Sequence, residues 1–205
     1  MTPSVIAEPD TAQTSAVEPQ NEERAWAALA QAGDQTAFLN IVDAYQRPIY
    51  NLCYRMLDNA AEAEDATQET FLRAYTKINS YQTSRKFSSW LFSIASHYCI
   101  DRLRRRRHQT VSWDELPPWR VTPDNAPQPE QVAETREAEH QLRTVIEDLA
   151  PDYRAAIILR YWHEMSYDEI AETLDTSVSA IKSRLFRAKQ MMGQKLATIE
   201  AMTPT

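Results

Sequence analysis

Hydrophobic side chains recur every three or four residues along most of the chain, which predicts amphipathic helices. The first such run begins at Arg24 and ends at Gly33. Residues 1–23 are rich in Pro, Glu, Gln, Ser and Thr, and this composition predicts a disordered tail. The next run follows Asp34, a residue type that caps helix N-termini. Pro48 lies inside that run, so we expect a kink or a restart of the helix there.

Two more helices are predicted at residues 58–79 and Phe87–Arg107, joined by the polar loop SYQTSRKF. Five of the eleven prolines lie between Pro117 and Pro129, which indicates a linker. Helical patterning resumes at 131–199. The chain has only two glycines, although β turns usually need them, so we predict an all-α fold. Its two helical domains span 24–108 and 131–199, with the linker at 109–130 and a tail at 200–205.

The second domain contains a helix-turn-helix pattern. Ser166 and Glu169 form a capping-box sequence at the start of a short helix, and a turn at 175–177 leads to a second helix from Val178. The apolar residues on one face of that second helix are expected to pack inward: Val178, Ile181, Leu185, Ala188 and Met192. Five basic residues and no acidic ones lie between Lys182 and Lys195. A single sign of charge on this helix favours DNA binding over an ordinary solvated surface.

A second basic cluster is the run DRLRRRRH at 101–108, in a chain with a net charge of −7. The run ends a helix, where the dipole favours cations, but this effect alone does not explain five arginines in six positions.

The cysteines, Cys53 and Cys99, are expected to be small buried side chains. His97 and Cys99 form an HxC pair, but the sequence lacks the short spacings of a four-ligand zinc site. We therefore expect neither a metal nor another cofactor.

Two segments resemble a known family. The first, from Leu39 to Arg107, contains AEDATQETFLRAY and FSSWLFSIASHYCIDRLRRRR and resembles the promoter-melting domain of bacterial sigma factors. The second, LAPDYRAAIILRYWHEMSYDEIAETLDTSVSAIKSRLFRAK, resembles their C-terminal domain. Two domains with a short linker are the pattern of the extracytoplasmic-function (ECF) branch of the sigma-70 family. The resemblance implies a non-enzymatic initiation factor that binds core RNA polymerase at the β′ clamp coiled coil and the β flap. It also implies promoter DNA as a partner, and an anti-sigma factor, which is common in the family.

The resemblance assigns polymerase binding to one face of the helix at 58–79. Five acidic residues and no basic one lie between Asp58 and Glu69. Asp65, Gln68 and Glu69 share a face at i, i+3 and i+4 and would meet the basic surface of the β′ clamp. Without the resemblance, a solvated acidic face is the preferred interpretation of these residues.

The loop before Phe87 matches the family's specificity loop for the −10 element. Its polar candidates for reading an unstacked base are Asn79, Ser80, Ser84 and Arg85. Phe87 and Trp90 carry aromatic rings that could stack on bases, although helical spacing makes Trp90 more consistent with the core. The arginines of the run would neutralise phosphates of the −10 duplex. They are Arg102, Arg104, Arg105, Arg106 and Arg107.

The second domain would read the −35 element. Candidates for base edges or nearby phosphates are Lys182, Ser183 and Arg187. Ser179 and Phe186 match family contact positions, and Arg160 matches a position that touches the DNA backbone. Many relatives carry Pro-x-Gly where this chain has Ser177-Val178-Ser179, which leaves its −35 preference open.

Other classes of protein fit the sequence less well. A helix-turn-helix regulator that is not a sigma subunit would carry a receiver or ligand domain with strands. A helical adaptor would not need two basic faces, and the sequence lacks the P-loop or metal-carboxylate motif of a nucleic-acid enzyme. Because the N-terminus has no apolar signal and no segment is long enough to span a membrane, we expect a cytoplasmic protein without membrane insertion.

Overall fold

The computed structural model describes residues 19–111 and 140–202, and within these ranges the elements are helices without a strand. The first range contains α1 (Pro19–Gln31), α2 (Gln35–Leu57), α3 (Ala60–Lys77), the 3₁₀ helix η1 (Ile78–Ser80) and α4 (Phe87–Val111). The second contains helical residues 140–147, α6 (Pro151–Tyr161), α7 (Tyr167–Thr173) and α8 (Val178–Met202). The predicted all-α fold is confirmed.

Helix α1 begins at Pro19 rather than at Arg24, so the predicted tail is wrong for its last five residues. These residues, PQNEE, are polar and add nothing to the hydrophobic periodicity on which the prediction rested. The helix is still favoured there because Glu22 lies in its first turn, where the dipole stabilises a negative charge. Residues 1–18 lie outside the described part of the chain.

The turn between α1 and α2 follows the sequence prediction. Gly33 has φ +94°, a conformation that costs a residue with a side chain, and Asp34 N–H donates to Leu29 O at 3.0 Å. Asp34 Oδ1 then accepts from Thr36 N at 2.8 Å and from Ala37 N at 3.2 Å. Asp34 is therefore the N-cap of α2, as predicted.

We expect Asp34→Ala to lower the free energy of unfolding by about 1 kcal/mol, because two N–H groups of α2 lose their acceptor. Urea denaturation followed by circular dichroism would measure the change. Asp34→Asn keeps a side-chain oxygen and serves as the control. Equal destabilisation by the two substitutions would show that the cap contributes nothing through its hydrogen bonds.

Helix α2 forms the centre of the first domain. It is continuous through Pro48, so the predicted restart is wrong. Buried side chains continue on both sides of this proline and hold the helix against α1, α3 and α4. They are Ala37, Phe38, Ile41, Tyr45, Ile49, Leu52, Cys53, Met56 and Leu57.

The second domain is built around α6. Residues 154–159 of this helix are all buried, because α7 and α8 cover one side and α2 and α4 cover the other. A short helix that is buried on all sides belongs to an interior, not to a surface. Together with α2 and α4, α6 forms one continuous hydrophobic core.

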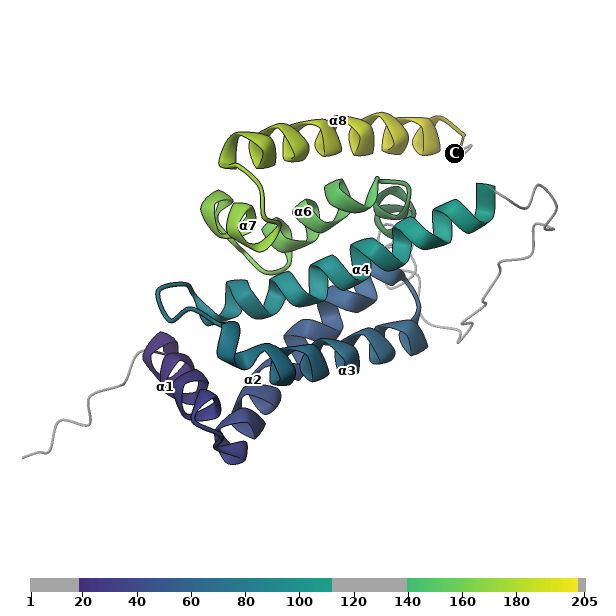
Figure 1. Cartoon of the computed structure of the whole chain (residues 1–205). Helices are drawn as coiled ribbons and strands as arrows, with labels where there is room; N and C mark the ends of the chain where they lie inside the picture. The colour runs from purple at the N-terminus through teal and green to yellow at the C-terminus, as the bar shows by residue number, and fades with distance from the viewer. Residues whose placement is uncertain (1–18, 112–139, 203–205) are drawn as a thin grey trace, which may run out of the picture.

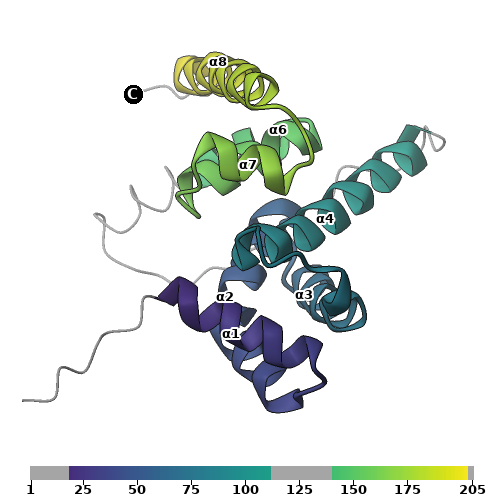
Figure 2. The ribbon, with the colours of Figure 1, turned by 60° about the vertical axis from the view of Figure 1, so that its left-hand side comes forward.

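Figures 1 and 2 show this arrangement, with α4 crossing the middle of the molecule. Helices α2 and α3 lie on one side of α4, α6 and α7 lie on the other, and α8 forms the outer layer beyond them.

Specific side-chain contacts join the two domains as well. The buried guanidinium of Arg154 donates from Nη1 to Met56 O at 2.6 Å, and the ring of His163 lies 4.6 Å from that of Phe92. Burial, with a smaller contribution from the positive charge of Arg55, lowers the pKa of His163 to about 4. The side chain is therefore neutral at pH 7 and suits an apolar contact.

The proposed linker at 109–130 is described only through Val111, the last residue of α4, and its remainder lies outside the described residues. The predicted tail at 200–205 begins inside α8, which continues to Met202. Within the described ranges, no helix is both long enough and apolar enough to cross a membrane.

Candidate nucleic-acid interface

The loop between η1 and α4 is held from the inside and exposes its polar side chains. Gln31 Nε2 donates to Ile78 O and Tyr81 O, both at 2.9 Å, and the Tyr81 hydroxyl donates to Arg85 O at 2.7 Å. The side chains predicted to read the −10 element are all exposed: Asn79, Ser80, Ser84 and Arg85. Their backbone is thus fixed before any ligand binds, an arrangement suited to recognition.

The aromatic side chains behind this loop belong to the core. Phe87 is buried, and its ring lies 5.2 Å from that of Tyr81 and 5.5 Å from that of Trp90. Phe87 is therefore unavailable for stacking on a base in this conformation, and half-buried Trp90 mainly packs against the loop.

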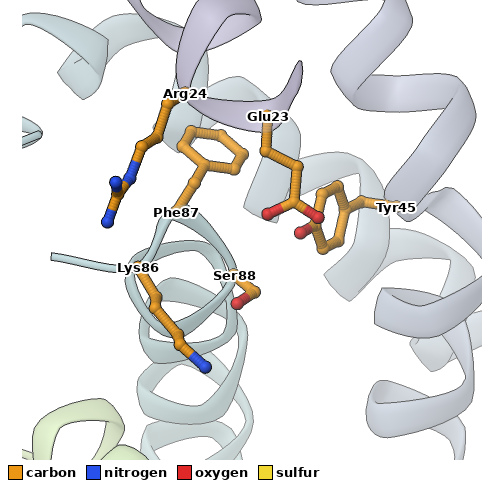
Figure 3. Close-up of a pocket in the computed structure, with 6 residues that line it drawn as sticks. All are labelled: Glu23, Arg24, Tyr45, Lys86, Phe87 and Ser88. Carbon is orange, nitrogen blue, oxygen red and sulfur yellow. The ribbon is translucent and has the colours of Figure 1, made fainter. Parts of the chain in front are cut away.

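Helix α1 contributes residues that the sequence analysis did not single out. Gln31, which holds the loop, is one of them. Helix α1 also supplies Glu23 and Arg24, which line a small cavity of about 190 Å³ next to the loop, shown in Figure 3. Tyr45 lines it too, and burial together with the Glu23 carboxylate raises the pKa of its hydroxyl above the usual range. Glu23 was assigned to a disordered tail, and Gln31 has no motif, so neither carried a signal in the sequence.

The arginine run of α4 divides into two groups. Glu62 of α3 accepts from Arg102 Nε at 2.9 Å and also from Arg106, so these two side chains bind α4 to α3. Arg104 Nη2 donates to Asp152 of α6 at 2.8 Å. The other two, Arg105 and Arg107, are exposed and form no ion pair with any described residue.

The predicted polymerase-binding face of α3 is mostly open. Asp65 and Gln68 are exposed, whereas Glu69 pairs with Arg73 one turn along the helix, at 2.7 Å. Leu72, next on this face, is 59% exposed. An open carboxylate and an exposed leucine on one helix face are suited to a protein partner that offers both charge and apolar surface.

The helix-turn-helix forms as predicted. Ser166 Oγ accepts from Glu169 N at 3.2 Å, while Glu169 Oε2 accepts from Ser166 N at 2.8 Å, which completes the capping box. In α8 the predicted inward face is buried or half-buried, and the predicted DNA-contacting side chains are all exposed: Ser179, Lys182, Ser183, Phe186 and Arg187.

Arg160 is less free than its predicted role requires. Its Nη1 donates to Met165 O at 2.8 Å, and its guanidinium lies 5.1 Å from the centre of the Tyr167 ring. Arg160 therefore supports the start of α7 in this conformation, and only part of its surface is open to solvent.

The structure places the predicted −10 loop against α7, the first helix of the helix-turn-helix. Lys86 Nζ donates to Glu169 Oε1 at 2.6 Å, and Arg85 Nε lies 3.5 Å from Glu172 Oε1. The hydrogen bond from Lys86 is the main reason that the pKa of Glu169 falls to about 2. Helix α7 thus lies against the loop of the first domain.

The cysteines and His97 do not come together as metal ligands. Cys99 is buried beside Cys53. A hydrogen bond with Cys53, together with burial, raises the pKa of the Cys99 thiol. His97, in contrast, is exposed. Within the described residues, no group of three His, Cys, Asp or Glu side chains is placed to hold a metal ion.

Comparison with known proteins identifies both domains. Residues 41–109 match the family model "Sigma-70 region 2", and residues 139–192 match "Sigma-70, region 4". The chain is 38% identical to the ECF RNA polymerase sigma factor SigW of Bacillus subtilis over 80% of its own length and 91% of that protein. It is 31% identical to the ECF RNA polymerase sigma-E factor of Escherichia coli, over 81% and 90% of the two chains.

Solved structures show the same fold. One is CnrH in complex with the cytosolic domain of CnrY, with a TM-score of 0.63 and 22% identity over 89% of this chain and 99% of that one. Another is the sigma factor RpoE of Bartonella quintana in complex with the anti-sigma factor NepR, with a TM-score of 0.59 and 21% identity over 78% and 96%.

A helical protein with these two regions in this order is of the sigma-70 type. More particularly, the chain belongs to the ECF RNA polymerase sigma factors, a family of transcription initiation factors.

Proposed function

We propose that this chain is the promoter-specificity subunit of an RNA polymerase holoenzyme, with its contacts divided among three surfaces. The face of α3 that includes Asp65, Gln68 and Glu69 binds the β′ clamp of core polymerase. The exposed loop at 79–86 reads and captures the −10 element. The exposed basic face of α8 reads the −35 element as duplex, and the second domain meets the β flap.

The observation that carries this proposal is the rigid but solvent-exposed loop at 79–86. Its backbone is held by Gln31 and Tyr81, so its polar side chains stand ready to hold an unstacked base without first ordering a flexible segment. Arg105 and Arg107 add positive charge that no described residue neutralises. The family to which the chain belongs supports the same division of roles.

The proposal also covers partners and location. The chain acts in the cytoplasm, where core polymerase and promoter DNA are found, and performs no chemistry of its own. The family resemblance supports an anti-sigma factor as a regulatory partner.

Transcription with purified components tests the proposal. The full chain added to core polymerase should produce promoter-specific RNA that neither component makes alone. A helix-turn-helix regulator that is not a sigma subunit would instead bind duplex promoter DNA without core enzyme and would not confer initiation on it.

Charge reversal on α3 tests the polymerase contact. Asp65→Lys should weaken binding to core enzyme on the order of tenfold at low salt, because a cation would then face the basic clamp. Fluorescence anisotropy of labelled protein titrated with core enzyme would measure it. Asp43→Lys, the same charge change at an exposed position of α2, is the matched control. Equal affinities of Asp65→Lys and wild type would remove this face from the interface.

A further inference from the structure

Helix α1 lies before the segment that matches the region 2 model, which begins at residue 41, yet its last residue reaches the base of the −10 loop. Gln31 Nε2 donates to Ile78 O and to Tyr81 O, both at 2.9 Å, across 47 and 50 residues of sequence. A side-chain amide nitrogen carries two N–H groups, so one glutamine can hold both carbonyls at once. Figure 1 shows α1 beside the start of α4, where this loop ends.

The two carbonyls flank two of the proposed base readers. Asn79 and Ser80 lie between Ile78 and Tyr81, and both are exposed. Tyr81 N also donates to Ile78 O at 3.1 Å, which closes the single turn of η1. Gln31 adds a hydrogen bond from outside this turn to each of its ends. The direction in which the two readers project therefore depends on a residue of α1.

Helix α1 is itself held firmly enough to serve as a support. Near its start, the Tyr45 hydroxyl of α2 hydrogen-bonds with Glu23 of α1 and with Ser88 of α4. Figure 3 shows these three side chains around the cavity next to the loop. Ala27, in the middle of α1, is fully buried in the core. Gln31 thus extends from a helix that is joined to both α2 and α4.

We propose that Gln31 is a positioning residue for −10 recognition, which fixes the direction of Asn79 and Ser80 and makes α1 part of the promoter-reading unit. The inference rests on the proposed function, because Asn79 and Ser80 are proposed readers of the −10 element. Gln31 acts through the loop, since both of its amide N–H groups are engaged by protein carbonyls.

Loss of these two hydrogen bonds should affect preferred promoters selectively. Without them the turn at 78–81 samples other conformations, and only the fraction in the reading conformation can hold an unstacked base. The apparent affinity for a readable −10 element then falls in proportion to that fraction. A promoter whose −10 element makes no such contact gains nothing from the ordered loop, so its affinity should not change.

Replacing Gln31 by methionine tests this expectation, because methionine keeps the length of the side chain and removes its donors. Holoenzyme affinity for the preferred −10 sequence, selected from a randomised pool, should fall between about threefold and thirtyfold. Affinity for a promoter with a substituted −10 element should stay the same. Gln46→Met, the same change at an exposed position of α2, is the matched control and should alter neither. Anisotropy of labelled promoter DNA would measure both affinities.

The ratio of the two affinities separates positioning from stability. Partial unfolding would remove active protein and weaken both promoters equally, which leaves the ratio unchanged. A double-mutant cycle identifies the residues through which Gln31 acts. In an Asn79→Ala/Ser80→Ala background, Gln31→Met should cause no further loss of discrimination. A further loss of the same size in that background would overturn the proposal, as would full discrimination by the Gln31→Met single variant.

Hydrogen exchange in the free full-length protein provides a readout that does not depend on DNA. The Tyr81 amide should exchange at least about threefold faster in Gln31→Met than in wild type or Gln46→Met, because the turn that protects it opens more often. Equal exchange in all three proteins would contradict the proposed role of Gln31. Failure of the proposed function is distinguishable. It would appear as full −10 discrimination by Asn79→Ala/Ser80→Ala, whatever the exchange rate at Tyr81.

Discussion

Promoter binding by holoenzyme should fall about 50-fold at 0.1 M salt when Arg105 and Arg107 are both replaced by alanine. Each arginine that neutralises a phosphate contributes roughly 0.9 to the slope of log affinity against log salt, so the slope should flatten by about two. These two side chains are exposed and form no ion pair with a described residue, which leaves them available for phosphates. Anisotropy of labelled promoter DNA across a salt series would measure both quantities.

Arg106→Ala provides the contrast within the same run. Arg106 is bound to Glu62 of α3, so its loss should lower stability and leave the salt slope nearly unchanged. The sequence alone gives no basis for distinguishing the five arginines. The structure distinguishes them by their ion pairs with Glu62 and Asp152. The double variant should lose affinity equally on promoters with different −10 sequences, because phosphate contacts carry no sequence information. A loss confined to one −10 sequence would mean that the run reads bases.

Most of the fold could be predicted from the sequence because its helices have one apolar face. The stripe through Ile41, Tyr45, Ile49 and Leu52 is periodic and buried, so pattern and structure coincide in α2. Gly33, Asp34 and the capping box act within a few residues of each other, and such local signals can be read directly. The start of α1 was missed because its residues PQNEE carry no hydrophobic periodicity.

The packing of the two domains could not be predicted in this way. Lys86 and Glu169 are separated by 83 residues, and nothing in either local sequence selects the other. One signal was present: the run AAIIL in α6 is apolar on every side of the helix, whereas a helix on the surface of a small domain keeps one polar face. Helices α7 and α8 of the second domain cover one side of this run, and α2 and α4 of the first domain cover the other.

The sequence also does not show which basic side chains are unpaired and can contact DNA phosphates. Composition places 22 basic and 29 acidic residues in the chain but does not show which of them pair. Glu62 engages two arginines that follow it by 40 and 44 residues, and Asp152 engages Arg104. The candidate phosphate contacts are therefore a subset of the basic run, and only the three-dimensional arrangement identifies that subset.

Substitutions in the recognition helix α8 should have the second large effect on promoter binding. Replacing Lys182 or Arg187 by alanine should cost roughly 1–3 kcal/mol of holoenzyme binding on the preferred −35 sequence, and less on a mutated one, if the side chain reads a base edge. Both are exposed, whereas Ile181 and Leu185 of the same helix are buried, and neither forms an ion pair within the described ranges.

Arg184 is the matched control for these substitutions on the same helix. It lies between Lys182 and Arg187 in sequence, but its side chain is 27% exposed and points toward Asp152, 3.9 Å away. Arg184→Ala removes the same charge as Arg187→Ala and should leave discrimination between −35 sequences unchanged. Binding of holoenzyme to matched −35 variants at one salt concentration separates the two outcomes. If Lys182→Ala and Arg187→Ala weakened every promoter equally, both residues would be phosphate contacts. The −35 preference would then have to arise from Ser179, Ser183 or Phe186, or from the shape of the DNA.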